Sequence, residues 1–202
     1  MAREAQKIQD LNTNQKTSMK KVLIAMAMLL VSGIAMAQDV TTFMGIPIDG
    51  TKDEMIKKLE EKGFTKDAEF LRGKFYGEDV LLSIGEDNDL VSTIYIIFND
   101  SSIDEAKTLY NSLVADFSKN KKYIPDGGDG IIIDKTELRH ILVSEDRTVV
   151  SYFLQKGHDG DKKKDIENKT VTVALSHSSG LNYSVGIAYC NEYNMPDHST
   201  DL

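Results

Sequence analysis

The sequence predicts an α+β protein in which antiparallel β-meander strands form one or two sheets and two helices pack on one face. Two capping-box motifs are each followed by apolar residues at helical spacing, which indicates two helices. Most of the remaining chain consists of short β-rich runs separated by turn-forming residues, as in antiparallel meanders. One run, residues 91–98, is apolar on both faces, which is typical of a central strand.

Both helices are defined by signals at their ends. The first is predicted at 51–62, because the capping box TKDE (51–54) opens it and Gly63 fits the left-handed position after its last turn. The second is predicted at 103–118, after the capping box SIDE (102–105). Apolar residues recur along it every three or four positions, so one face is expected to pack into the core.

The strands are predicted from alternating or continuous apolar runs between turns. The runs are 43–48, 70–75, 80–84, 91–98, 138–144, 149–154, 170–176 and 183–189. Each predicted helix is followed by at least three of these strands. We therefore predict a single domain over residues 38–202, and its order is also compatible with two α-βββ units at 43–98 and 102–190.

Residues 19–37 have the pattern of a secretory signal peptide. Two lysines precede an apolar run of about 13 residues, and Ala35-Met36-Ala37 gives the small-residue pattern that a signal peptidase cleaves. The run is shorter than the roughly 20 residues that a membrane-spanning helix needs. We therefore predict cleavage after Ala37 and a periplasmic or secreted protein with no stable membrane span.

The polar leader at residues 1–18 has two explanations. Either the start codon is assigned too far upstream and Met19 is the true start, or the signal peptide has an unusually long positively charged region. Both leave the same mature chain, 38–202. The full chain has a net charge of −8, and the first 37 residues carry more basic than acidic residues, so the mature part is more acidic still. Such a chain repels phosphate backbones, and we predict no nucleic-acid partner.

Cys190 is the only cysteine, so no disulfide can form within the chain. It follows Ser184, Gly186 and Ala188 at a period of two, which predicts a small residue packed on one face of a strand. A reactive thiol needs a basic neighbour to lower its pKa, and Glu192 is the nearby charged residue.

No motif predicts a metal site, a cofactor or a catalytic residue. The acidic loop 126–134 lacks the alternate acids and the final glutamate of a calcium loop, and we interpret it as a flexible loop. The loop 157–165 combines His and Asp with many Gly and Lys residues, which favours a solvated tip over rigid zinc ligands. His177 and Ser178 are adjacent on a predicted strand and should point to opposite faces. No nucleophile elbow, P-loop or dinucleotide-binding glycine motif occurs.

Four tyrosines in the predicted strands are candidates for a contact surface. They are Tyr95, Tyr152, Tyr183 and Tyr189. The alternative is that they only fill the faces of the sheet.

The two ends of the predicted mature chain resemble a group of small exported proteins from Bacteroidota. The resemblance rests on FMGIPIDGTKDEMIKKLEEKGF (43–64) and YSVGIAYCNEYNMPDHSTDL (183–202). It implies an exported location and the same fold, and it implies no activity. Cys190 departs from the pattern, because such proteins often have Asp there. At a looser level, the order of elements is similar to that of β-lactamase-inhibitor-like and SmpA/OmlA-like domains.

Together these observations predict an exported, non-catalytic binding or protein-interaction module. An envelope protein or peptide is the first expected partner, and a small molecule or glycan is the second. The third hypothesis is an envelope hydrolase that uses carboxylates from different strands.

Overall fold

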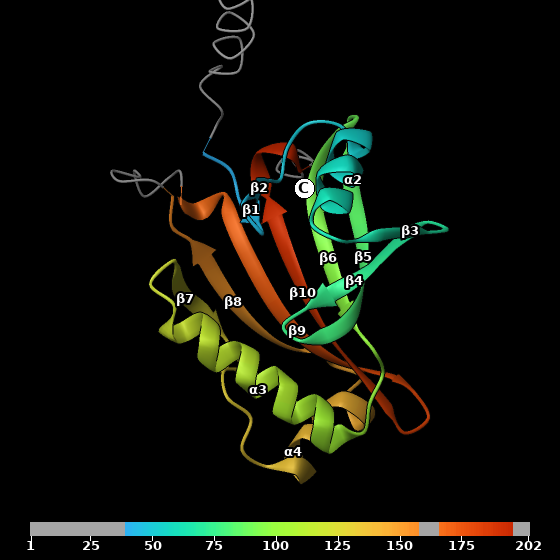
Figure 1. The fold of residues 1–202 in the computed structure, drawn as a ribbon. Coiled ribbons are helices and arrows are strands. Elements are labelled where there is room, and N and C mark those ends of the chain that lie inside the picture. Colours follow the sequence, from blue (N-terminus) through green and yellow to red (C-terminus); the bar gives the residue numbers. More distant parts are fainter. Residues whose placement is uncertain (1–38, 158–165, 196–202) are drawn as a thin grey trace, which may run out of the picture. The chain divides into compact units, whose positions relative to one another are not determined.

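The computed structural model describes residues 39–157 and 166–195, and eight antiparallel strands in them form one sheet (Figure 1). The strand order is β3-β4-β5-β6-β10-β9-β8-β7, and a separate hairpin, β1–β2, precedes the first helix. The strands are β1 (Thr42–Phe43), β2 (Ile46–Pro47), β3 (Thr65–Asp67), β4 (Phe70–Phe75), β5 (Glu78–Asp87), β6 (Leu90–Phe98), β7 (Tyr123–Gly128), β8 (Val149–Gln155), β9 (Lys169–Ser179) and β10 (Asn182–Asn191).

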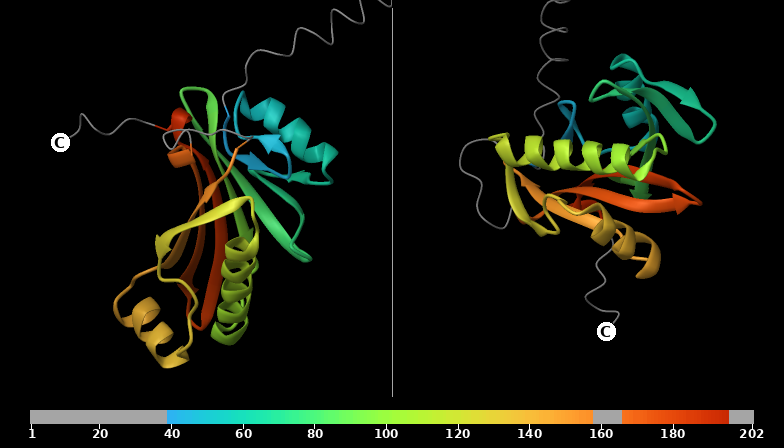
Figure 2. Two further views of the ribbon diagram at one scale, coloured as in Figure 1. Left: turned by 90° about the vertical axis from the view of Figure 1, so that its left-hand side faces the viewer. Right: turned by 90° about the horizontal axis from the view of Figure 1, so that it is seen from below.

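The two long helices, α2 (Lys52–Glu61) and α3 (Ile103–Lys119), start at the predicted capping boxes. In each box the N-cap hydroxyl accepts a hydrogen bond from the amide three residues later, and the glutamate there accepts one from the N-cap amide. The apolar faces of both helices join one hydrophobic core on the same face of the sheet (Figure 2). The predicted α+β class is therefore confirmed.

Each half of the described chain is a helix followed by four strands. Helix α2 precedes β3 to β6, and α3 precedes β7 to β10. The last strands of the two halves, β6 and β10, pair antiparallel and join the halves at the centre of the sheet. Two short helical segments, α4 (Lys135–Arg139) and the π-helical η1 (His140–Ser144), lie between β7 and β8, and η2 (Glu192–Asn194) follows β10.

The prediction of a strand over 138–144 is wrong, because this segment forms the end of α4 and all of η1. Asp134 caps α4 by accepting a hydrogen bond from the Glu137 amide at 2.8 Å. Leu138 and Leu142 then lie about one turn apart, and both are buried in the core. Burial of these two leucines favours the helix over a strand.

The predicted strand at 43–48 is interrupted by a turn. Met44 (φ 50°) and Gly45 (φ 79°) are both left-handed, and they reverse the chain between β1 and β2. The Thr41 hydroxyl donates a buried hydrogen bond to the Cys190 carbonyl oxygen. These contacts place the hairpin beside the end of β10.

The predictions for the leader and the signal peptide concern residues 1–37, which lie outside the described residues. Within residues 39–157 and 166–195, no helix is both long enough and apolar enough to cross a membrane.

Candidate functional site

The face of the sheet that α2 and α3 leave uncovered, called here the open face, has small uncharged residues on the neighbouring strands β9 and β10. Side chains alternate along a strand, and the buried Val185 and Ile187 of β10 point toward the helices. The opposite set therefore lies on the open face: Ser184, Gly186, Ala188 and Cys190 from β10, and Thr170, Thr172, Ala174 and Ser176 from β9.

Two of the four candidate tyrosines lie on this open face. Tyr95 of β6 is 44% exposed and Tyr152 of β8 is 43% exposed. They belong to one cross-strand row, because Tyr95 pairs with Ala188, Ala188 with Thr172, and Thr172 with Tyr152. Three strand spacings separate the two tyrosines, which corresponds to about 14 Å.

Tyr183 and Tyr189 do not belong to this exposed surface, so their assignment to one contact surface with the other two is wrong. They are 2% and 4% exposed and point into the core on the helix-covered face. The alternation that puts Ala188 on the open face puts Tyr189 on the other. The sequence already shows this alternation, because small residues alternate with larger ones along 183–190.

Cys190 and His177 occupy structural positions. Burial raises the pKa of the Cys190 thiol, which keeps it protonated and unreactive. The His177 ring packs on Tyr183 at 5.5 Å, and its Nε2 lies 3.0 Å from the Gly180 carbonyl oxygen. Ser178 instead donates a hydrogen bond to Asp100 at 2.7 Å, so His177 and Ser178 do not form a nucleophile and base pair.

Asp129, in the acidic segment 126–134, contacts other parts of the protein. Asp129 forms an ion pair with Arg147 at 3.0 Å and accepts a hydrogen bond from the Val150 amide at 2.9 Å. Residues 126–128 belong to strand β7, so the interpretation of 126–134 as a loop is wrong for these three residues. Most of the loop 157–165 lies outside the described residues. Among the residues that are described, no three His, Cys, Asp or Glu side chains group to hold a metal ion.

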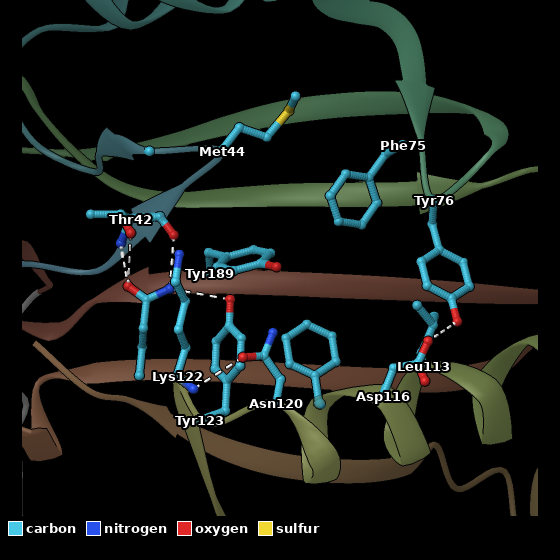
Figure 3. Close-up of a pocket in the computed structure, with 13 residues that line it drawn as sticks. Thr42, Met44, Phe75, Tyr76, Leu113, Asp116, Asn120, Lys122, Tyr123 and Tyr189 are labelled. Atoms are coloured by element: carbon cyan, nitrogen blue, oxygen red, sulfur yellow. Dashed lines mark hydrogen bonds between the residues drawn. The ribbon is translucent and has the colours of Figure 1, made fainter.

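A pocket of about 350 Å³ opens on the helix-covered side, between hairpin β1–β2, the turn after β4 and the C-terminal half of α3 (Figure 3). Aromatic rings line much of it: Phe75, Tyr76, Phe117, Tyr123 and Tyr189. Several of these rings contact one another, with centroids 4.7 Å apart for Phe117 and Tyr123 and 6.3 Å apart for Phe117 and Tyr189. These ring contacts hold the aromatic lining in place.

Tyr76 closes one end of the pocket. Its hydroxyl donates a hydrogen bond to the Asp116 carboxylate, which connects the β4–β5 turn to α3 (Figure 3). This hydrogen bond, with burial and the negative charge of Asp116, raises the pKa of Tyr76 to about 12. Tyr76 also has a left-handed backbone (φ 56°), which a two-residue hairpin turn with Gly77 requires.

Gln155 fixes the opposite wall. Its Oε1 accepts hydrogen bonds from the Thr42 amide at 2.7 Å and the Thr42 hydroxyl at 3.1 Å. Its Nε2 donates to the Thr42 carbonyl oxygen at 2.9 Å and to the Tyr123 hydroxyl at 3.3 Å. Burial, together with the neighbouring Tyr123, also raises the pKa of Tyr189 well above its usual value.

The pocket can bind a largely apolar group and orient it with a few polar atoms. Its apolar surface comes from the aromatic rings, Leu113 and Met44, and polar side chains at its edge are Asn120 and Lys122. The sequence did not indicate this site, because its residues come from separate segments between Thr42 and Tyr189 and share no motif.

No protein-family model, curated protein sequence or solved structure was found to match this chain. The resemblance at the two ends of the chain therefore stays a prediction.

Proposed function

We propose that this protein is an exported, non-catalytic binding module and that the pocket beside hairpin β1–β2 is its ligand site. The observation that carries the proposal is an aromatic-lined pocket that is open, already formed and bordered by a few polar groups, as in small-ligand sites. Its two walls come from different halves of the chain and are joined by the Tyr76–Asp116 and Gln155–Thr42 hydrogen bonds. These hydrogen bonds fix the two walls relative to each other.

The proposal includes that the protein has no catalytic activity. Among the described residues that line the pocket, Asp116 is the one carboxylate, and it already accepts a hydrogen bond from the Tyr76 hydroxyl. The raised pKa of Tyr76 makes this tyrosine a poor base at neutral pH. Hydrolysis of an envelope substrate by the purified protein, lost on substitution of Asp116, would contradict the proposal.

Export is proposed from the signal-peptide pattern. The mature chain should begin at Gln38, which mass spectrometry of the protein from its native envelope can determine. An intact Met1 in a cytosolic fraction would refute export.

The ligand site is tested by a thermal-shift screen of small molecules, because a ligand that binds only the folded state must raise the melting temperature. Asn120 is an exposed pocket-lining residue, so Asn120→Trp should fill the pocket with little effect on folding. Asn182→Trp, at an exposed end of β10, is the matched control. Compounds should stabilise the wild type and Asn182→Trp but not Asn120→Trp. Equal stabilisation of all three would rule out this pocket.

Binding of an envelope protein is a second candidate function, and the open face favours it. Tyr95 and Tyr152 are exposed there across a row of small, uncharged residues, in a chain with a net charge of −8. A photo-crosslinking amino acid at position 152 should capture one partner in cells, whereas the same group at Leu181, on an exposed turn, should not. Identical products from both positions would argue against a specific partner on this face.

A further inference from the structure

We infer that the ligand of this pocket is a small amphiphilic anion, with its apolar part against the aromatic rings and its carboxylate beside Lys122. This inference rests on the proposed function and adds the chemical class of the ligand. It depends on the size of the pocket, on its lining and on the distribution of charge around it.

The size limits the apolar part of the ligand. A water molecule occupies about 30 Å³ in the liquid, so 350 Å³ corresponds to roughly a dozen non-hydrogen atoms. A medium-chain carboxylate such as decanoate has this size.

The lining favours an apolar group in the interior of the pocket. Phe117 and Tyr189 are buried, and Leu113 of α3 is almost fully buried beside them. Met44, which is 40% exposed, lies on the opposite wall and presents a flexible thioether (Figure 3). A ligand between Met44 and α3 would remove water from both surfaces, which is the main driving force for binding an apolar group.

One positive side chain, Lys122, lies at one end of the pocket, and further lysines are near it in the backbone. Lys122 lines it, Lys119 and Lys121 precede it in the chain, and the Lys156 amide donates a hydrogen bond to the Lys122 carbonyl oxygen at 2.8 Å. Among the described residues, none of these four lysine side chains takes part in an ion pair. Lys122 is thus a cation at the edge of the pocket with no ion-pair partner in the part of the chain that the structure describes, and it can attract an anionic group.

The negative charge of the pocket is at the other end, which sets the orientation of the ligand. Figure 3 places Tyr76 with Asp116 at one end and Lys122 at the other. A carboxylate next to Asp116 would be repelled, whereas one beside Lys122 would be attracted. The apolar chain therefore extends from Lys122 toward Phe75 and Tyr76.

The test compares three probes of equal chain length: decanoate, decan-1-ol and decylammonium. Each is titrated into the mature protein below its micelle concentration, and methyl NMR signals are followed. Decanoate should shift the Met44 and Leu113 methyl signals without shifting those of Ile97 and Val150 on the open face. Decanol should bind the same site at least five-fold more weakly, and decylammonium more weakly still.

Two variants separate charge from apolar contact. Lys122→Gln should weaken decanoate at least five-fold and leave decanol unchanged, and Lys57→Gln, on the exposed side of α2, should change neither. If decanol and decanoate bind the pocket equally, the anion inference fails while the proposed ligand site stands. If no probe shifts Met44 or Leu113, or if decylammonium binds best, the inference is also overturned.

Discussion

Gln155 is expected to be the residue that holds the pocket wall in place, and its substitution gives a measurable loss of stability. The side chain is 5% exposed and forms three hydrogen bonds to Thr42, two through Oε1 and one through Nε2. Each such bond contributes about 1 kcal/mol net, and an unsatisfied buried polar group costs about 1–3 kcal/mol. Gln155→Ala should therefore lower the free energy of unfolding by about 2–4 kcal/mol.

The variant should still fold, because the hairpin has a second anchor. Phe43 is fully buried, and its ring contacts those of Phe75 and Tyr189 at 5.4 and 5.2 Å. Urea unfolding followed by circular dichroism measures the change. With a slope of about 2 kcal/mol per molar urea, the midpoint should fall by about 1–2 M. Asn182→Ala, an exposed amide on β10, is the control and should shift the midpoint by less than about 0.3 M. A shift for Gln155→Ala no larger than the control would refute this role.

Three further predictions concern the core and its titrating groups. Burial raises the pKa of Tyr110 to about 12, so its contribution to stability should be complete below pH 10 and lost as the pH rises from 10 through 12. Urea unfolding at a series of fixed pH values measures this decline, and Tyr110→Phe should make the decline less steep. Burial raises the pKa of the Cys190 thiol, so in the native state at pH 8 it should resist a thiol-specific disulfide reagent, and in denaturant it should react fully. Fast reaction in the native state would contradict its burial. Leu142→Ala should lower the free energy of unfolding by about 2–5 kcal/mol, because it opens a cavity beneath η1. Val143→Ala, at an exposed position, should lower it far less, and equal losses would contradict the helical register.

The elements that were predicted correctly depend on local signals. The two capping boxes fix the starts of α2 and α3, because each is a reciprocal pair of hydrogen bonds within four residues. The strand β4 was predicted at its observed bounds, Phe70–Phe75, where a left-handed Tyr76-Gly77 turn follows directly.

The errors concern segments that tertiary contacts decide. The run HILVS (140–144) is rich in β-branched and apolar residues, yet Leu138 and Leu142 are buried from a helix. The sequence did hold a signal, since Asp134 and Glu137 have capping-box spacing. Strand β7 includes Pro125 and two glycines, and only its pairing with β8 defines it.

The candidate site could not be assembled from sequence for the same reason. Tyr76 and Asp116 are 40 positions apart, and Thr42 and Gln155 are 113 apart. The two residues of each pair come together only after β6 and β10 pair and join the two halves. The small residues around Tyr189 indicated which face of the strand it lies on. They did not indicate that it lines a pocket.

The most direct test of the central claim is native mass spectrometry of the protein isolated gently from its own envelope, with Asn120→Trp alongside. A ligand site in this pocket predicts a small-molecule adduct on the wild type that is released on denaturation and missing from Asn120→Trp. A wild type that carries no adduct, or an adduct that Asn120→Trp retains equally, would contradict the claim that this pocket is where the protein binds its ligand.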